Sequence, residues 1–427
     1  MYSQIRDKYD TLELPFKLPD ITLPECFGSK SSSSSSSSSR PLSLPFQSSF
    51  HRPSSSIGFR VDTPNPAVDY AHSIEDFLNN ALEPTKYEYK KLKERDQRKH
   101  VLKIHADVAR RRDHLQLNRF INIYPYDFNR IKLQVPVSGS DYLNGSYISG
   151  PKSVKNSNES SVLMETRQTM DYSRYENISF LATQGPLPET LEHHWQAIYE
   201  NDVDIIVMLT KMVEGARGGQ PGNKKCDQYW PSGVGETTAY GTYDVTLVSE
   251  EHPRAELIKR QLYLLDTREM CDKRRTGKFK SATHLHYVGW PDYGVPEENN
   301  HIVELVKDVR RIIKDDTERT EKCNILVHCS AGVGRTGTFI ALYQLMEKIE
   351  NILMERQMPG TSDSATMDGV QHINIFSTVY GLRSKRVEMV QSWVQYKYLY
   401  ASVSAYAAQI NGSNTPDVEE SDYVNYK

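Results

Sequence analysis

A cysteine and an arginine lie six residues apart in a glycine-rich stretch of the sequence, and together they could perform covalent chemistry. Cys329 follows the apolar residues 325–327 and precedes Gly332, Gly334 and Arg335. This order predicts a buried strand, a turn and a helix, so that several backbone N–H groups and the positive end of a helix dipole meet at one point. A thiol at such a point, beside an arginine, ionises readily, and we expect Cys329 to act as a nucleophile without a general base.

The other side chains of this stretch predict that it binds a phosphoryl dianion. Arg335 carries a planar, permanent charge that can hold two phosphoryl oxygens at once, which a lysine cannot do. We expect Thr336 to donate a hydrogen bond to the sulfur and His328 to keep the loop in shape. The backbone around the phosphate would come from Ser330, Ala331, Gly332, Val333 and Gly334.

The same glycines also fit a dinucleotide-binding pattern. Gly332, Gly334 and Gly337 are spaced as G-x-G-x-x-G between an expected strand and an expected helix. A dinucleotide site needs neither the cysteine nor the arginine, and no suitable acidic residue ends a strand about 20 residues later. We therefore favour a phosphate-binding loop.

The string His-Cys-Ser-Ala-Gly-Val-Gly-Arg-Thr at residues 328–336 resembles the signature HCxAGxGR[S/T] of protein-tyrosine phosphatases of the non-receptor type. Further motifs of that family follow in the expected order over roughly residues 85–408. The resemblance implies hydrolysis of phosphotyrosine in proteins through a cysteinyl-phosphate intermediate, in intracellular signalling. It also implies that no cofactor and no metal take part.

The resemblance supplies a proton donor and residues that position water. Residues 290–292, Trp-Pro-Asp, resemble the family's acid loop, so Asp292 is the expected proton donor to the leaving tyrosine and then the base that activates water. The segment 389–396 resembles the family's glutamine loop. Gln391, supported by Gln395, is therefore expected to position that water.

The resemblance also supplies a substrate pocket. Phe120 stands where the family usually has tyrosine, and its ring would form the aromatic wall beside the substrate ring. Asn122 would hold the substrate backbone, and Glu214 would pair with Arg335 and orient it. Three further segments match family motifs that we interpret as structural: 141–146, 182–186 and 225–231.

The elements that must position these residues predict one α/β domain. Apolar runs at 205–209 and 325–327 indicate buried strands, and the spacing of apolar residues at 302–313 indicates an amphipathic helix. We expect a single phosphatase-like catalytic domain over residues 69–409, with a twisted mixed sheet flanked by helices and with leading helices at 69–117. The polar segments 152–177 and 357–368 are expected to be loop insertions.

The two ends of the chain differ from this body in composition. Residues 1–68 are rich in serine and proline and include nine consecutive serines at 31–39, a composition that predicts disorder. Residues 410–427 are expected to form an acidic tail, in which Tyr423 is a candidate phosphorylation site.

Whole-chain composition excludes several classes of protein. With 52 Lys+Arg against 55 Asp+Glu the net charge is −3, so no nucleic-acid partner is expected. The five cysteines form neither a disulfide framework nor a zinc pattern. No apolar run of about 18 residues and no signal sequence occurs, so we expect no membrane insertion and a cytoplasmic location, with the nucleus as an alternative.

Two other functions remain open at this point. One is a module that binds phosphotyrosine without hydrolysing it, although Cys329, Asp292, Arg335 and Gln391 are all present. The other is a phosphatase of broader range that acts on phosphoserine or on lipid phosphates, against which the aromatic Phe120 argues.

The expected partners are phosphotyrosine-containing proteins, with a kinase as one candidate. Residues 110–112, three arginines followed by Leu115 and Leu117, have the form of a docking peptide for acidic kinase grooves. A solvated helix end would give the same pattern.

Overall fold

The computed structural model describes residues 70–79, 82–97, 104–149, 178–215, 221–268, 279–291, 294–315, 322–357 and 372–411. The chain divides into two units, residues 1–63 and 64–427, and all described residues belong to the second. The expected serine-rich N-terminal region, the insertion 152–177, most of the insertion 357–368 and the tail with Tyr423 lie outside the described residues.

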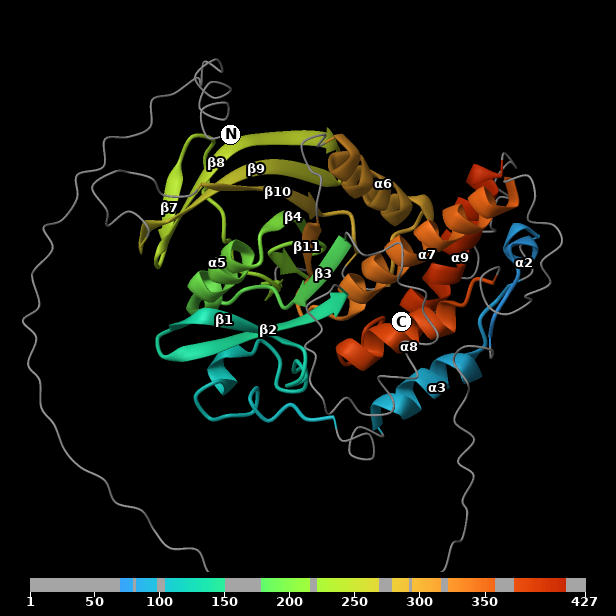
Figure 1. The fold of residues 1–427 in the computed structure, drawn as a ribbon, viewed down its shortest axis with the longest axis horizontal. Helices are drawn as coiled ribbons and strands as arrows, with labels where there is room; N and C mark the ends of the chain where they lie inside the picture. Colours follow the sequence, from blue (N-terminus) through green and yellow to red (C-terminus); the bar gives the residue numbers. More distant parts are fainter. Residues whose placement is uncertain are drawn as a thin grey trace, which may run out of the picture. The chain divides into compact units, whose positions relative to one another are not determined.

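Among the described residues, nine strands form one mixed sheet in the order β1-β2-β3-β11-β4-β10-β9-β8-β7 (Figure 1). The four central strands β3, β11, β4 and β10 are parallel, and the outer pairs are antiparallel. The strands are β1 (Arg130–Val137), β2 (Ser140–Ser149), β3 (Ile178–Thr183), β4 (Val203–Met208), β7 (Thr237–Tyr240), β8 (Tyr243–Arg254), β9 (Leu257–Asp266), β10 (Lys280–Tyr287) and β11 (Cys323–His328).

The central strands β4 and β11 carry runs of apolar residues because both of their faces are covered. In β11, Ile325 and Val327 face the larger hydrophobic core, whereas Leu326 faces a second core on the opposite side of the sheet. The predicted α/β fold with a mixed sheet flanked by helices is therefore confirmed.

Helices cover the two faces unequally (Figure 1). Helix α5 (Leu191–Glu200) packs through Trp195 and Ile198 on one face. The larger core lies on the other face, under α2 (Ile74–Leu78), α3 (Lys86–Gln97), α6 (Asn300–Asp315), α7 (Gly334–Gln357), α8 (Ile375–Lys385) and α9 (Trp393–Ile410). No helix in the described part of the chain is both long enough and apolar enough to span a membrane.

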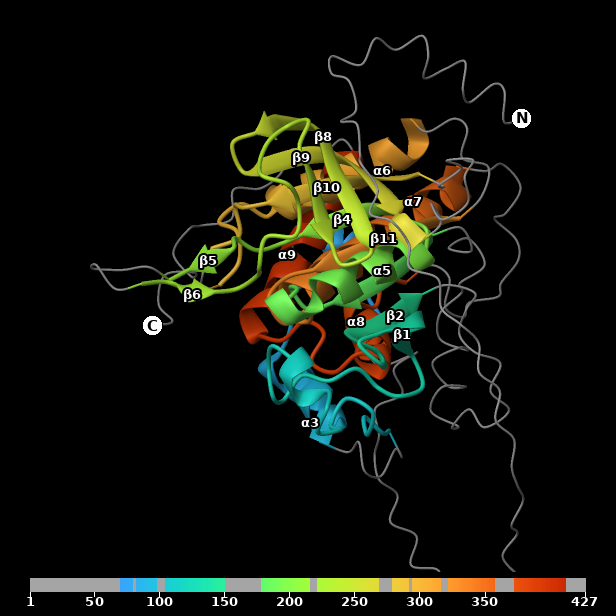
Figure 2. The same ribbon diagram turned by 90° about the vertical axis from the view of Figure 1, so that its left-hand side faces the viewer.

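Three smaller features complete the described part. Short 3₁₀ helices occupy Leu115–Leu117 and Pro188–Thr190. The hairpin β5 (Val213–Glu214) and β6 (Asn223–Lys224) extends away from the main sheet (Figure 2). Of the leading segment 69–117, α2 and α3 are helical, whereas residues 107–114 form turns.

Candidate functional site

The turn that contains Cys329 joins the end of β11 at His328 to the start of α7 at Gly334. We call residues 329–334 the Cys329 loop. Gly332 has φ +71°, and a Cβ atom built there would lie 2.0 Å from the carbonyl oxygen of Thr183 on β3. A backbone atom cannot move aside easily, so only glycine allows the loop to lie this close to the sheet.

Two donors surround the sulfur of Cys329, whose residue is only 5% exposed. The backbone N–H of Gly332 and the hydroxyl of Thr336 each donate a hydrogen bond to Sγ at 3.3 Å. Hydrogen bonds to sulfur at the N-terminus of a helix stabilise its anionic form. The structure thus places at this sulfur the donors that a nucleophilic thiolate needs.

Arg335 lies beside the loop in a fixed orientation. Its NH1 and NH2 groups donate to the two carboxylate oxygens of Glu214 at 2.5 and 2.9 Å, and NH1 also donates to Thr210 Oγ1 at 3.2 Å. Burial disfavours the charged form of Glu214, but the hydrogen bonds and the charge of Arg335 outweigh this effect and hold the pKa of the carboxyl below its usual value. The bidentate pair fixes the plane of the guanidinium.

The acid loop is described only on either side of the expected proton donor, because Asp292 lies outside the described residues. The carbonyl oxygen of Pro291 accepts a hydrogen bond from Arg335 NH2 at 3.0 Å. Trp290 is buried, and its indole N–H donates to the carbonyl oxygen of Gly294 at 3.3 Å. Residue 291 therefore contacts the same arginine that lies beside the Cys329 loop.

Phe120 belongs to a segment that Arg119 anchors. The backbone N–H of Arg119 donates to Gln184, its Nε to the carbonyl oxygen of Gly185 at 3.0 Å, and its NH2 to Asp227. Gly185 in turn donates its N–H to the carbonyl oxygen of Ser330 in the Cys329 loop at 2.9 Å. The motifs at 182–186 and 225–231, interpreted from sequence as structural, thus hold the Phe120 segment next to the loop.

The side chains of that segment remain open to solvent. Phe120 is 37% exposed and Asn122 is also exposed, so both are available to a bound substrate. The roles predicted for them stay predictions.

The two glutamines lie near the loop but are engaged elsewhere. A Cβ atom built on Gly334 would lie 2.9 Å from Gln395 Nε2 and 3.4 Å from Gln391 Cβ. The Gln391 amide donates to Glu388 at 2.8 Å, and Gln395 forms the capping box at the start of α9 with Ser392. The role predicted for Gln391 in positioning water stays a prediction.

A buried arginine that the sequence did not suggest holds the outside of the loop. Arg386, fully buried, donates to the carbonyl oxygens of Gly332 at 2.8 Å and Ala331 at 3.1 Å, and to Asn144 at 2.7 Å. Burial lowers its pKa to about 10, so it remains charged at neutral pH. Because these carbonyls are fixed outward, the N–H groups of the same turn are free to face inward.

Sequence reasoning missed Arg119 and Arg386 for different reasons. Arg119 lies within the recognised segment 118–122 and could have been noted there as the residue before the aromatic wall. Arg386 follows a helix pattern in a basic stretch, and nothing local distinguishes it from a solvated residue.

The candidate docking peptide is only partly accessible. Arg110, Arg111, Arg112 and Leu115 are exposed, whereas Leu117 is buried against Ala109 and Tyr142. An extended docking peptide needs both leucines free. This fold therefore favours the solvated-turn interpretation.

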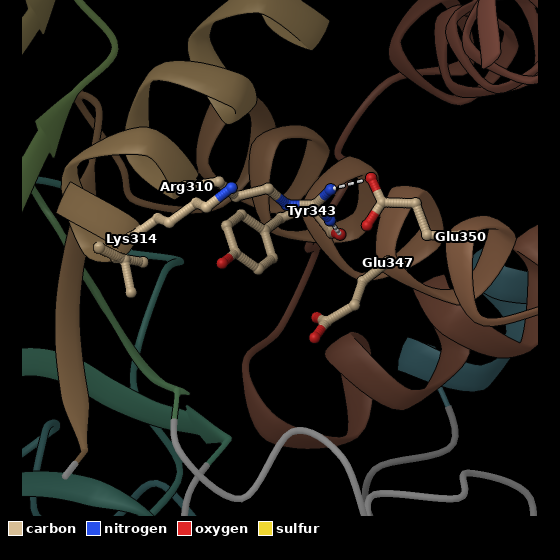
Figure 3. Close-up of a pocket in the computed structure, with 6 residues that line it drawn as sticks. Arg310, Lys314, Tyr343, Glu347 and Glu350 are labelled. Atoms are coloured by element: carbon tan, nitrogen blue, oxygen red, sulfur yellow. Dashed lines mark hydrogen bonds and ion pairs between the residues drawn. The ribbon is translucent and has the colours of Figure 1, made fainter. Parts of the chain in front are cut away.

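A separate hollow of about 210 Å³ lies between α6 and α7, at least two turns along α7 from the Cys329 loop. Figure 3 shows Arg310 turned toward Glu350, with Glu347 outside that pair. Its lining residues are Arg310, Ile313, Lys314, Tyr343, Glu347 and Glu350. None of them belongs to the site around Cys329.

Comparison with known proteins gives one family match, described as "Protein-tyrosine phosphatase", over residues 114–405. Receptor-type tyrosine-protein phosphatase eta of Gallus gallus is 35% identical over 302 residues, which are 70% of this chain and 17% of the relative. Receptor-type tyrosine-protein phosphatase alpha of Homo sapiens is 30% identical over 354 residues, 82% of this chain and 34% of the relative.

Another relative, "Phosphatidylinositol phosphatase PTPRQ" of Rattus norvegicus, is 34% identical over 288 residues, 67% of this chain and 10% of the relative. The chain thus matches only a small part of each of these relatives. Two of the relatives have receptor-type names, so they do not support the finer prediction of a non-receptor type.

Proposed function

Because the chain belongs to the protein-tyrosine phosphatase family, we propose that it hydrolyses phosphotyrosine in proteins through a cysteinyl-phosphate intermediate on Cys329. The observation that carries this proposal is the pair of donors, Gly332 N–H and Thr336 Oγ1, at the sulfur, together with the fixed guanidinium of Arg335. This arrangement can stabilise both a thiolate and the charge that develops on a transferring phosphoryl group.

In the first step the thiolate forms a bond to phosphorus while the bond from phosphorus to the tyrosine oxygen breaks. Asp292 supplies the proton that the departing phenolate needs. In the second step water attacks phosphorus, Asp292 takes a proton from it, and the thiolate departs as phosphate is released. Arg335 holds the phosphoryl oxygens in both steps, and the Thr336 hydroxyl stabilises the sulfur when it leaves.

Glutamine and histidine residues support these steps. We assign Gln391 to the water of the second step, after its amide has left Glu388, with Gln395 in support. His328 is fully buried behind the loop and shapes it from there. Glu214 orients Arg335, Phe120 stacks on the substrate ring, and Asn122 binds the substrate backbone.

A phosphoinositide phosphatase is the second candidate function, because one relative at 34% identity bears that description. The exposed ring of Phe120, held next to the Cys329 loop through Arg119 and Gly185, favours a flat aromatic substrate. Turnover of a phosphotyrosyl peptide, a phosphoseryl peptide and a phosphoinositide by one purified sample separates the candidates. Preference for the phosphoinositide would overturn the first.

The test of the covalent step is Cys329→Ser, which should abolish phosphate release because a serine hydroxyl is a far weaker nucleophile without a base. Cys323→Ser, at the buried opposite end of β11, is the matched control and should keep its activity. Phosphate release from a phosphotyrosyl peptide measures both variants. A Cys329→Ser protein with unchanged activity contradicts the mechanism.

We also propose that this domain acts in a reducing compartment, the cytoplasm or the nucleus. Cys226 and Cys329 are free thiols, which fits such an environment. The proposal applies equally to the catalytic part of a receptor-type or a non-receptor protein. Fractionation of cells that express the natural full-length product would decide between these two types.

A further inference from the structure

A chain of buried polar side chains runs behind the Cys329 loop. The hydroxyl of Tyr229 lies 2.6 Å from His328 Nε2 and 2.9 Å from His284 Nε2. The other ring nitrogen of His328, Nδ1, lies 3.2 Å from the carbonyl oxygen of Cys329. The side chains of Tyr229, His284 and His328 are fully buried, so water cannot replace these hydrogen bonds.

The chain starts at Arg260 on β9. Its NH1 group lies 3.5 Å from His284 Nδ1 and 3.4 Å from His286 Nδ1. Its Nε donates to Glu250 at 2.7 Å, and its guanidinium lies 4.6 Å from the centre of the Trp230 ring. These two contacts hold the arginine so that NH1 points at both histidines.

The three histidines of this network, His284, His286 and His328, are uncharged. Burial, the largest effect, lowers the pKa of His286 to about 4 and that of His328 to about 3, and it lowers the pKa of His284 well below its usual value. A neutral imidazole carries one proton, on either Nδ1 or Nε2. Its two nitrogens therefore have opposite hydrogen-bonding roles.

An arginine can only donate and a carbonyl oxygen can only accept, so both ends of the chain require the same direction for every bond between them. His284 Nδ1 must accept from Arg260, so its proton is on Nε2 and is donated to the Tyr229 oxygen. Tyr229 then donates its own proton to His328 Nε2. His328 must consequently carry its proton on Nδ1, from which it donates to the Cys329 carbonyl.

A second branch starts from the same NH1 group. His286 Nδ1 accepts from Arg260, so His286 Nε2 donates to the carbonyl oxygen of Thr210 at 2.9 Å. The hydroxyl of Thr210 contacts both Arg335 NH1 at 3.2 Å and Glu214 at 2.8 Å. The two branches therefore end on the peptide of the nucleophile and on the residue that contacts the phosphate-binding arginine.

We propose that Arg260 is a positioning residue which, by donating to His284 and His286 together, completes two hydrogen-bond chains of fixed direction and so fixes both the Cys329 loop and Arg335. The proposal rests on the phosphatase function proposed above. Arg260 touches no reacting atom and acts only through the two oriented chains.

The first test reads the tautomers directly. Nitrogen NMR of ¹⁵N-histidine-labelled protein distinguishes the two neutral tautomers, and single histidine-to-glutamine variants assign the signals. In the wild type we expect the proton on Nε2 of His284 and His286 and on Nδ1 of His328. The opposite tautomer at His284 or His328 would overturn the proposal.

Variants then separate positioning from mere structural support. Arg260→Met removes the donor and leaves Nδ1 of His284 and of His286 without its hydrogen bond, so the Nδ1 signals of both rings should shift, while the carbonyls at the far ends of the two chains keep the tautomers unchanged. The matched control is Arg254→Met, since Arg254 lies in the same β8–β9 hairpin but binds Asp308 instead of the histidines. The control should leave both Nδ1 signals and activity unchanged. Wild-type Nδ1 chemical shifts at both histidines in a folded Arg260→Met protein would contradict the proposal.

Kinetics supply the second readout. Displacement of reacting groups by about 1 Å can cost about 100-fold, so we expect Arg260→Met to lower kcat/KM by about that factor. Tyr229→Phe interrupts only the first branch and should cost less. Because both residues act through one chain, adding Tyr229→Phe to Arg260→Met should change kcat/KM little further. Independent, multiplying losses would overturn the shared chain.

The NMR and kinetic measurements together also distinguish this proposal from the function on which it rests. A wild-type protein with the expected tautomers but without phosphotyrosine hydrolysis overturns the proposed function. Full hydrolysis with the opposite tautomers overturns the role of Arg260 alone.

Discussion

Arg335 is held by a carboxylate whose contribution can be measured separately. Glu214 is buried and bidentate on the guanidinium, so Glu214→Gln keeps the shape of the side chain but loses its charge and one strong acceptor. We expect kcat/KM for a phosphotyrosyl peptide to fall about 10- to 100-fold, because the guanidinium plane is no longer fixed.

The control for this change is Glu236→Gln, because the side chain of Glu236 is exposed and accepts from the backbone N–H of Gly233, away from Arg335. It should have wild-type kinetics. Activity of Glu214→Gln within twofold of the wild type would show that Arg335 needs no partner to act.

Gly332 tests the backbone of the Cys329 loop. Its positive φ and the 2.0 Å approach of the Thr183 carbonyl oxygen both oppose a side chain. We expect Gly332→Ala to lower the free energy of unfolding by about 3 kcal/mol or more, measured by urea denaturation. Gly139→Ala has a similar φ of +82° but open space, and should cost only about 1 kcal/mol. Equal losses would mean that the clash is relieved by movement of the loop.

At the scale of elements, helix α3 holds the turn that carries Gln391. The hydroxyl of Tyr89 donates to the carbonyl oxygen of Gln391, and Arg383 of α8 donates to the carbonyl oxygens of Met389 and Val390 at 2.9 and 2.8 Å. Glu88, one residue earlier in α3, accepts from the hydroxyls of Tyr396 and Tyr400 in α9. Tyr89 of α3 thus helps to position a turn 302 residues later in the sequence.

Tyr89→Phe removes the hydroxyl that donates to the Gln391 carbonyl and that also lies beside Arg383. If Gln391 positions the water of the second step, hydrolysis of the intermediate should slow by about fivefold. This factor corresponds to the loss of one hydrogen bond, which contributes about 1 kcal/mol. Rapid-quench experiments should then trap more covalent phosphoenzyme than in the wild type. Tyr87→Phe on the exposed face of α3 is the control. Unchanged accumulation of the intermediate would separate α3 from the second step.

At the scale of the whole molecule, the Glu347 carboxyl in the hollow between α6 and α7 should make the free energy of unfolding depend on pH. Burial, with Glu350 adding to it and Arg310 opposing it, raises the pKa of Glu347 to about 7. The folded state therefore binds a proton that the unfolded state releases at lower pH. The carboxyl destabilises the fold in full above about pH 7, and this penalty shrinks as the pH falls from there toward the ordinary pKa of 4.5, below which it is absent.

Glu347→Gln should accordingly stabilise the protein at pH 8 and have little effect at pH 5. Since solvent reaches the hollow, we expect a gain on the order of 1 kcal/mol, measured by denaturation at both pH values. Glu350→Gln, which removes the partner of Arg310 and Tyr406, should destabilise the protein instead. A gain of equal size at pH 5 and pH 8 would contradict the assignment to Glu347.

The sequence by itself determined the α/β class, the family and the chemistry expected of the Cys329 loop. It could do so because the strand, the turn and the start of the helix are contiguous: residues 323–336 carry the nucleophile, the glycines and Arg335 within one local unit. Local sequence order is enough to predict such a unit, since its geometry depends mainly on neighbouring residues.

Only the tertiary structure decided what holds this unit in place. Arg386 reaches Asn144 across 242 residues of sequence, and Arg335 reaches Glu214 across 121. The tertiary structure also showed that Leu117 is buried and that Gln391 donates to Glu388. Partners and side-chain directions of this kind depend on which distant elements pack together, and no local pattern of residue types specifies that packing.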